Sequence, residues 1–357
     1  MDEKIIFLGG EFNNEGGRKS TISDILYNSM GLKDAECHNG GHLSELENIA
    51  QRAKEYSLAF WFAQIPKGMA SPARIAKNTN PALTLVGSLR NMDNVPFLQV
   101  VNHALVSNHN LLVEFSKINE RYQARVLDPL GNVYAHTQNM KNIASVVKNR
   151  AFELLKYTRI GSTKEGEQIP APHLEKFYTL VREKGELFSQ MVESVAREER
   201  FMGNASFRCE RGFPSFKEDN LIFVSRRNVN KISITQNDFV AVKPSLPVEY
   251  FGNAKPSVDT PIQIKLYNNY PWAKYLLHGH AYIKNAPFTN RIVPCGAIEE
   301  SEEIISLFPN RSSVNFSVNL KGHGSLTLAD NIASLRSVEY ICRPVPEYNT
   351  IYGGKYE

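Results

Sequence analysis

Hydrophobic positions in the first part of the chain alternate between short apolar runs and helical spacing. The apolar runs predict buried strands at 4–8, 58–65, 83–89 and 111–115. Apolar residues at helical spacing predict helices at 20–30, 45–56, 97–106 and 140–157. Residues 122–127 and 132–135 flank the turn sequence Asp128-Pro129-Leu130-Gly131, which predicts a hairpin. Strands that alternate with helices indicate a mostly parallel sheet, so we expect a doubly wound α/β domain of Rossmann or flavodoxin-like type over residues 1–160.

The pattern changes after residue 160. Residues 161–172 are polar, contain Gly and Pro and have no periodicity, so we expect an interdomain linker there. A long helix is predicted at 174–195, and short strands at 206–208, 221–225 and 239–242. Further helices are expected to begin near Pro261 and Asp330. We therefore expect a second domain over residues 173–357.

Composition excludes several classes of protein. The chain has 357 residues, enough for two cores, and its net charge of +4, without a basic run, does not favour a nucleic-acid partner. Its four cysteines lie far apart and form no CxxC pair, which favours reduced thiols. No apolar run approaches the roughly 18 residues of a membrane span. We expect a cytoplasmic protein without a membrane partner.

Three histidines carry the strongest chemical signal. His278-Gly279-His280 follows the apolar run Tyr275-Leu276-Leu277, and residues two apart on a strand point to the same face. His323 lies between Gly322 and Gly324, whose small size permits close approach. Three neutral imidazoles with an open fourth position are typical of a catalytic zinc site. The alternative is a set of packed or surface histidines.

Four segments of the second domain, taken in their order along the chain, resemble the class II aldolase/adducin family. They are Gly203-Asn204-Ala205-Ser206-Phe207-Arg208, Val224-Ser225-Arg226-Arg227-Asn228, Lys255-Pro256-Ser257-Val258-Asp259-Thr260-Pro261, and His278-Gly279-His280 with the later Gly322-His323-Gly324. The resemblance implies a three-layer α/β/α domain, and it covers roughly the second half of the chain.

The resemblance also implies roles for individual residues. His278, His280 and His323 match the family's ligands for a divalent metal, for which zinc is the expected ion. Asp259 matches the family's proton-transferring glutamate. The residues implied in substrate binding are Asn204, Ser257, Ser225 and Arg227.

Each role has a structural alternative. Asp259 precedes Thr260-Pro261, so either Asp259 or Thr260 could cap the helix that begins there. Asn204 could be a turn residue, and Arg226 with Arg227 could be solvated surface charges.

The chain departs from the family pattern at three places. Asp259 is one methylene shorter than the usual glutamate, Val258 replaces a serine, and Ser225-Arg226-Arg227-Asn228 replaces a Thr-Pro-Ser/Thr-Gly loop. Two guanidinium groups could bind a carboxylate or phosphate instead, so the substrate can differ from a simple ketose 1-phosphate.

A glycine-rich segment follows the first predicted strand. Gly9, Gly10, Gly16, Gly17 and Ser20 stand where open α/β sheets bind ligands, although their spacing fits neither the P-loop nor G-x-G-x-x-G. We predict a small-ligand loop, with the alternative that the loop is flexible and Ser20 caps the first helix. A second glycine-rich turn, Asn39-Gly40-Gly41-His42, is expected at the same edge.

These observations predict a metal-dependent aldolase-type lyase of carbohydrate metabolism that cleaves a sugar or sugar phosphate by retro-aldol chemistry. An epimerase or decarboxylase would use the same metal site. A non-catalytic adducin-like scaffold and a ligand sensor that has lost its activity are the remaining alternatives. The resemblance further implies a homo-oligomer, most often a tetramer.

Overall fold

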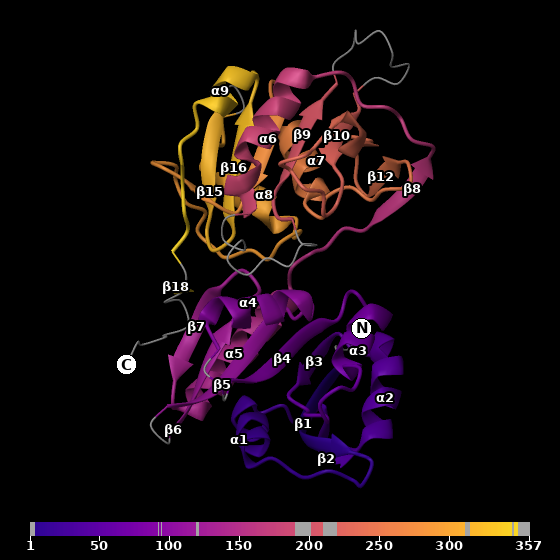
Figure 1. Cartoon of the computed structure of the whole chain (residues 1–357), viewed down its shortest axis with the longest axis vertical. Coiled ribbons are helices and arrows are strands. Elements are labelled where there is room, and N and C mark those ends of the chain that lie inside the picture. Colours follow the sequence, from indigo (N-terminus) through magenta and orange to yellow (C-terminus); the bar gives the residue numbers. More distant parts are fainter. Residues whose placement is uncertain are drawn as a thin grey trace. The chain divides into compact units, whose positions relative to one another are not determined.

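The computed structural model describes residues 4–91, 93, 95–118, 121–189, 201–209, 220–310, 315–344 and 346–348. The chain divides into two compact units (Figure 1): a C-terminal unit from Tyr157 to Pro344, and an N-terminal unit made of the residues on either side of it. Each unit is built around its own sheet.

The N-terminal unit alternates strands and helices. Its strands are β1 (Ile5–Asn13), β2 (Glu36–His42), β3 (Leu58–Trp61), β4 (Thr84–Asn91), β5 (Leu111–Ile118), β6 (Arg121–Leu127), β7 (Asn132–Thr137) and β18 (Glu347–Tyr348). Its helices are α1 (Thr21–Met30), α2 (Leu43–Gln51), η1 (Ala53–Glu55), α3 (Pro72–Thr79), α4 (Phe97–Val106) and α5 (Met140–Leu155).

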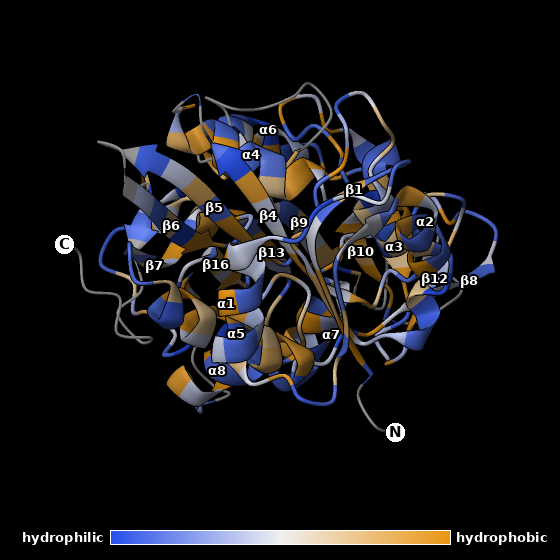
Figure 2. Ribbon diagram, turned by 90° about the horizontal axis from the view of Figure 1, so that it is seen from below, coloured by the Kyte–Doolittle hydropathy of each residue, from blue (hydrophilic) through white to orange (hydrophobic). Residues whose placement is uncertain are grey.

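The strand order of this sheet is β18-β7-β6-β5-β4-β3-β1-β2. Strands β2, β1, β3, β4 and β5 are parallel and have the flavodoxin-like order 2-1-3-4-5, whereas β6 and β7 add an antiparallel hairpin. Helices α1 and α5 pack together on the sheet, as do α2 and α3, and Figure 2 shows that α1 and α5 carry both hydrophobic and hydrophilic residues. The predicted doubly wound domain is confirmed.

Local signals explain the helix that follows β1. The Ser20 hydroxyl accepts a hydrogen bond from Ser23 N, and Gly31 ends the helix in the left-handed conformation. Leu26 and Met30 are buried. The alternative reading of Ser20 as an N-cap is therefore confirmed.

The glycine-rich segment forms main-chain contacts. Gly9 and Gly10 lie inside β1, which is longer than predicted, and Glu11 and Arg18 exchange backbone hydrogen bonds of 2.7 and 3.2 Å. A Cβ at Gly17, where φ is +55°, would lie 1.8 Å from the carbonyl oxygen of Glu11. Gly10 and Gly16 have positive φ as well, so the tight reversal of the chain explains these glycines without a ligand.

The C-terminal unit is built on a second, mostly antiparallel sheet in the order β15-β16-β13-β9-β10-β11-β12-β8. Its strands are β8 (Ser162–Gly166), β9 (Asn204–Arg208), β10 (Ile222–Ser225), β11 (Phe239–Val242), β12 (Val248–Phe251), β13 (Tyr275–Gly279), β15 (Phe316–Leu320) and β16 (Gly324–Ala329), with a separate pair β14 (Tyr282–Ile283) and β17 (Tyr340–Ile341). Its helices are α6 (Glu175–Ser189), η2 (Gln236–Asp238), α7 (Thr260–Asn269), α8 (Glu299–Leu307) and α9 (Ile332–Arg336).

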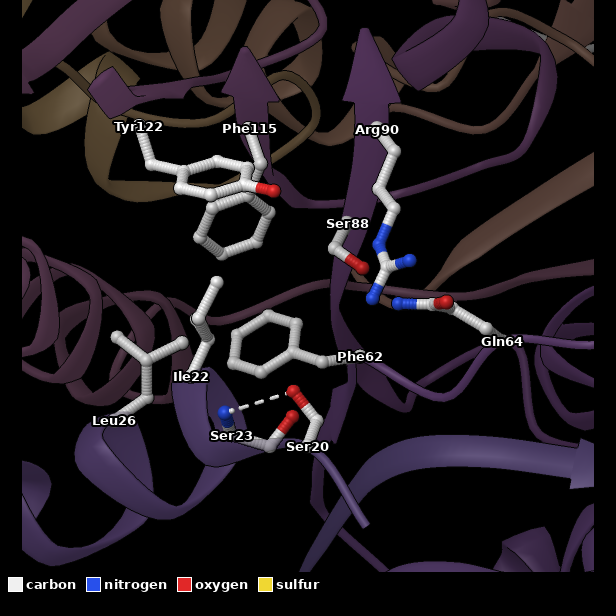
Figure 3. A pocket seen from close by; sticks show the side chains of 10 residues that line it. All are labelled: Ser20, Ile22, Ser23, Leu26, Phe62, Gln64, Ser88, Arg90, Phe115 and Tyr122. Carbon is white, nitrogen blue, oxygen red and sulfur yellow. Dashed lines mark hydrogen bonds between the residues drawn. The ribbon is translucent and has the colours of Figure 1, made fainter. Parts of the chain in front are cut away.

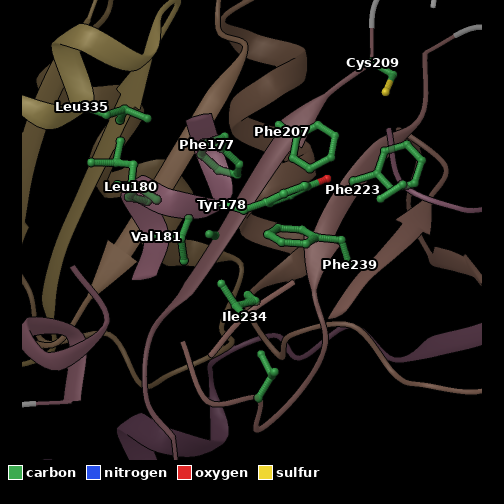
Figure 4. Packing of buried hydrophobic residues seen from close by; sticks show 14 of the residues in the cluster. Phe177, Tyr178, Leu180, Val181, Phe207, Cys209, Phe223, Ile234, Phe239 and Leu335 are labelled. Carbon is green, nitrogen blue, oxygen red and sulfur yellow. The ribbon is translucent and has the colours of Figure 1, made fainter. Parts of the chain in front are cut away.

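Two hydrophobic clusters cover the two faces of this sheet. On one face, α6 and α9 pack on aromatic strand residues; Figure 4 shows Phe177 and Tyr178 of α6 against Phe207 and Phe239. On the other face, residues of α7 and α8, such as Leu266 and Ile304, pack with the alternate strand residues. The predicted three-layer α/β/α arrangement is confirmed.

The structure differs from the sequence expectation at the boundaries. Residues 162–166 of the expected linker form β8, which pairs in parallel with β12. Residues 347–348, expected in the second domain, pair with β7 of the N-terminal sheet instead. Both changes come from backbone pairing with distant strands, which leaves no periodic signal in so short a segment. Residues 190–195 of the predicted long helix lie outside the described residues. Among the described helices, none has the length and apolar character needed to cross a bilayer.

Candidate metal centre

Strand β13 and the hairpin beside it position the three histidines. His278 lies in β13, paired with Asn204 of β9 on one side and Leu326 of β16 on the other, and His280 follows directly. His323 lies in the tight turn between β15 and β16. A Cβ at Gly324, where φ is +159°, would lie 2.1 Å from the carbonyl oxygen of Gly279, so only glycine permits this approach to β13.

The three imidazoles converge on one point. One ligand nitrogen from each of His278, His280 and His323 lies within 4.8 Å of those of the other two. The ring centroids are 5.4 Å apart for His278–His280, 4.7 Å for His278–His323 and 5.0 Å for His280–His323. Each side chain is almost completely buried. The geometric expectation from the sequence, that histidines remote in the chain meet, is therefore met.

Each imidazole also carries an unsatisfied ring nitrogen. His278 Nε2, His280 Nδ1 and His323 Nε2 are buried and have no hydrogen-bond partner among the residues that the structure describes. Buried polar atoms are normally paired, so three orphaned nitrogens at one point demand an explanation. A cation bound by lone pairs satisfies all three, and this donor set fits a divalent metal ion.

Hydrogen bonds to the other ring nitrogens set the orientation of two histidines. His278 Nδ1 donates to the carbonyl oxygen of Ser325 at 2.9 Å, and His323 Nδ1 donates to Glu300 Oε1 at 2.7 Å. A proton held on Nδ1 leaves the lone pair on Nε2, as a metal ligand requires.

Burial shifts the acid–base behaviour of this cluster. Burial lowers the pKa of His278 to about 4 and that of His280 well below its usual value, so both are neutral near pH 7. Burial acts in the same direction on His323, but the Glu300 carboxylate beside it raises the pKa of His323 well above its usual value. This favours a protonated His323 whose Nδ1 proton is held by Glu300, and a bound cation would displace the proton on Nε2.

Asp259 points toward the histidines and does not cap a helix. It occupies the position before α7, yet its side chain makes no capping hydrogen bond there. Asp259 Oδ2 lies 3.9 Å from His278 Nε2, and the side chain is buried. Its other contacts are a hydrogen bond of 2.7 Å from Asn204 Nδ2 and a 3.6 Å contact from Cys295 Sγ. The reading of Asp259 as a side-chain cap is therefore wrong.

Asn204 holds the carboxylate in place. Besides Asp259, it donates to Ser257 Oγ at 3.1 Å, and its amide oxygen accepts a hydrogen bond from Gln263 Nε2. Asn204 lies in β9 and is buried, so it is a strand residue and not a turn residue. Its amide is used for positioning Asp259 and Ser257.

Of the other predicted substrate-binding residues, Ser225 lies beside Ser257, whose backbone N–H donates to the carbonyl oxygen of Ser225 at 3.2 Å. Ser225 is fully buried and its hydroxyl accepts from Ala205 N at 3.1 Å, which ties β10 to β9. Arg226 pairs with Asp238 at 2.8 Å. Arg227 is exposed, and its guanidinium has no hydrogen-bond or ion-pair partner among the described residues. A clamp made of both arginines is therefore not formed, because Asp238 already occupies Arg226.

Two residues near the histidines were not predicted from the sequence. Glu300 stands in an acidic first turn of α8, a pattern that is typical of a solvated helix start, yet it is buried. Lys231 is buried with its Nζ 3.3 Å from the carbonyl oxygen of Phe201, and burial lowers the pKa of Lys231 to about 7, with partial opposition from Asp259. Neither residue belongs to a motif, so only tertiary packing reveals them.

Comparison with known proteins finds a family match within this unit. Residues 196–286 match the family profile described as the Class II Aldolase and Adducin N-terminal domain. The match covers part of the C-terminal unit, within which residues 196–286 are similar to a class II aldolase/adducin domain. The matched segment contains Asn204, Asp259, His278 and His280, and His323 lies beyond it.

Similarity to individual proteins is local. A methylthioribulose-1-phosphate dehydratase of Picosynechococcus sp. is 40% identical over 65 residues, which is 18% of this chain and 31% of that protein. The match thus spans about a third of the length of the curated relative. An L-fuculose-1-phosphate aldolase from Thermus thermophilus aligns with 16% identity and a TM-score of 0.31, over 46% of this chain and 84% of the other. The N-terminal class II aldolase domain of a conserved protein from Thermoplasma acidophilum aligns with 15% identity and a TM-score of 0.32, over 45% and 85%.

Proposed function

We propose that the class II aldolase/adducin domain is a metal-dependent lyase that cleaves a carbon–carbon bond of a sugar or sugar phosphate by retro-aldol chemistry. The observation that carries this proposal is the convergence of three buried, unpaired imidazole nitrogens beside the Asp259 carboxylate. A scaffold needs neither the orphaned nitrogens nor a buried acid aimed at them.

His278, His280 and His323 would hold the ion, for which zinc is the expected choice among divalent metals. A bound divalent cation polarises a substrate carbonyl and stabilises negative charge on its oxygen.

The chain's own groups would handle the proton and the orientation of the substrate. Asp259 is within reach of a substrate atom held beside His278, and its carboxylate would move the proton of the hydroxyl at the cleaved bond. Asn204 would keep that carboxylate aimed, because its amide donates to Asp259 Oδ2. Ser257, and Arg227 as an exposed cation, would orient the anionic end of the substrate, and Lys231 adds a buried amine near Asp259.

Dehydration of a sugar phosphate is the second candidate. The named relative with 40% identity over 65 residues is a dehydratase. Removal of water would use Asp259 differently: its carboxylate would take the proton from the carbon next to the carbonyl, and the hydroxyl on the following carbon would leave, protonated, as water. Epimerase and decarboxylase activities remain chemical alternatives at this site. Oligomerisation and cytoplasmic location stay predictions, to be tested by light scattering and by cell fractionation.

The test combines metal content with product analysis. Purified protein, stripped with a chelator and reconstituted with zinc, manganese, iron or cobalt, is expected to bind one ion per chain. His323→Ala is expected to lose that ion, whereas His173→Ala, an exposed histidine of the same unit, is expected to keep it. Reconstituted protein is then assayed against ketose 1-phosphates: an aldehyde and a shorter ketone indicate cleavage, and a product lighter by one water indicates dehydration. Absence of metal after reconstitution would refute both the cleavage and the dehydration activity.

A further inference from the structure

The N-terminal unit has a topological switch point between β1 and β3. From β1 the chain passes through α1 to β2 on one side, and then through α2 to β3 on the other side of β1. In open parallel sheets, the crevice beyond the carboxyl ends of the strands at such a point is where ligands bind. The structure has a cavity at this place.

The cavity lies beside the start of α1, near the carboxyl ends of β3, β4 and β5. One end is polar, formed by Ser20 at the N-cap of α1, by Gln64 after β3, and by Ser88 and Arg90 of β4. The other end is apolar, formed mainly by Phe62, Phe115 and Tyr122. Its volume is about 110 Å³, below the roughly 150 Å³ of an apolar cavity that accommodates benzene, so a ligand larger than one small ring would extend beyond it.

Strand register explains the division into two ends. Ser88 and Arg90 are two apart in β4, so both side chains point to one face, and Phe115 is directly opposite Arg90 in β5. Figure 3 shows the Arg90 guanidinium, the Gln64 amide and the Ser88 hydroxyl gathered together, with the rings of Phe62, Phe115 and Tyr122 beside Ile22 and Leu26. One carboxylate nearby, Glu114, alternates to the opposite face and is already paired with Arg125 at 2.9 Å.

Three polar side chains of the cavity are uncommitted, whereas the Ser20 hydroxyl accepts a hydrogen bond from Ser23 N. Within the described part of the chain, the guanidinium of Arg90, the amide of Gln64 and the hydroxyl of Ser88 have no hydrogen-bond or ion-pair partner. An arginine beside an amide and a hydroxyl is a donor set for an oxyanion, because its planar fork matches a carboxylate or phosphate with two hydrogen bonds. Aromatic walls favour a flat apolar group.

We propose that this cavity binds a small organic anion, with its phosphate or carboxylate on Arg90, Gln64 and Ser88 and a single flat ring against Phe62, Phe115 and Tyr122. The site is independent of the histidine centre and of the lyase function. It also differs from the glycine loop predicted from the sequence, of which only Ser20 is among the lining residues.

The proposal is tested by calorimetric titration of the full chain at low salt with phenyl phosphate, benzoate and phenol. The titrations are done with a chelator present, so that binding of an anion to a metal does not contribute. Saturable binding of at least one of the two anions, at least tenfold tighter than that of phenol, is expected. Whichever of phenyl phosphate and benzoate binds more tightly shows whether the site prefers a phosphate or a carboxylate.

Two variants locate the binding. Arg90→Ala is expected to weaken binding of the anion at least tenfold, and Arg74→Ala, an exposed arginine on α3 away from the cavity, is expected to leave it unchanged. Ser88→Leu, which fills the polar end, is expected to weaken it as well. Absence of saturable binding for both anions, equal binding of phenol, or equal effects of the two arginine variants would overturn the proposal.

Discussion

The contact between Glu300 and His323 makes a quantitative prediction about metal affinity. Glu300 Oε1 accepts the Nδ1 proton of His323 at 2.7 Å, and both side chains are buried. A hydrogen bond to a charged group contributes about 1.5–3 kcal/mol and a neutral one about 0.5–1.5 kcal/mol. Glu300→Gln keeps a hydrogen-bond acceptor but removes the charge. The free energy of metal binding is therefore expected to weaken by about 1–1.5 kcal/mol. This corresponds to roughly tenfold weaker metal binding.

Glu300→Leu removes the acceptor altogether. The Nδ1 proton of His323 then has no partner and the ring orientation is no longer held, so metal affinity is expected to fall about 10–100-fold. Both values are measured by competition with a chromophoric zinc chelator at constant pH. Thermal denaturation of the metal-free variants separates a loss of affinity from a loss of fold.

The matched control is Glu303→Gln on the same helix. Glu303 is also buried, but it pairs with Arg291 at 2.6 Å and does not contact a histidine. The Glu303→Gln substitution is expected to leave the zinc affinity within about twofold of that of the unsubstituted protein. If Glu300→Gln and Glu303→Gln bind zinc equally well, Glu300 does not orient His323 and the reasoning is wrong.

Three further predictions concern the C-terminal unit. Asp259→Asn is expected to keep metal binding but to lower turnover by at least about 10²-fold, measured by steady-state kinetics, since the amide cannot take up the proton; unchanged turnover would exclude a chemical role. Phe207→Ala is expected to destabilise this unit by about 3–5 kcal/mol in denaturant unfolding, because Phe207 is fully buried among aromatic rings; a loss below about 1 kcal/mol would contradict the packing. Since burial lowers the pKa of Lys231 to about 7, the unfolded chain binds more protons between about pH 7 and its usual value of 10.5. Stability should therefore rise with pH in that window, by up to about 1.4 kcal/mol per pH unit, and Lys231→Met should abolish this slope in unfolding measured at several pH values.

The pattern of apolar residues by itself predicted the fold class of the N-terminal unit, whereas the three-layer fold of the C-terminal unit was implied by the family resemblance of its motifs. Local signals of strand period, helix spacing and caps such as Ser20 are short-range and survive in one dimension, so the alternating α/β order and most helices were predictable. The three histidines were also predictable, because spacing on a strand and flanking glycines leave a readable motif. The identity of the three histidines is therefore readable from the sequence, whereas their convergence depends on the pairing of β13 with β16.

Tertiary structure alone decided what surrounds that centre. Whether Asp259 caps a helix or faces His278 depends on Asn204, which is 55 residues away in the chain, and the partner of His323 is Glu300 on another helix. The same holds for β8 and β18, which are short segments defined by distant strands, and for the cavity at Arg90. Long-range contacts of this kind carry no periodicity along the chain, because each depends on how separate elements pack. They appear only when the chain is folded.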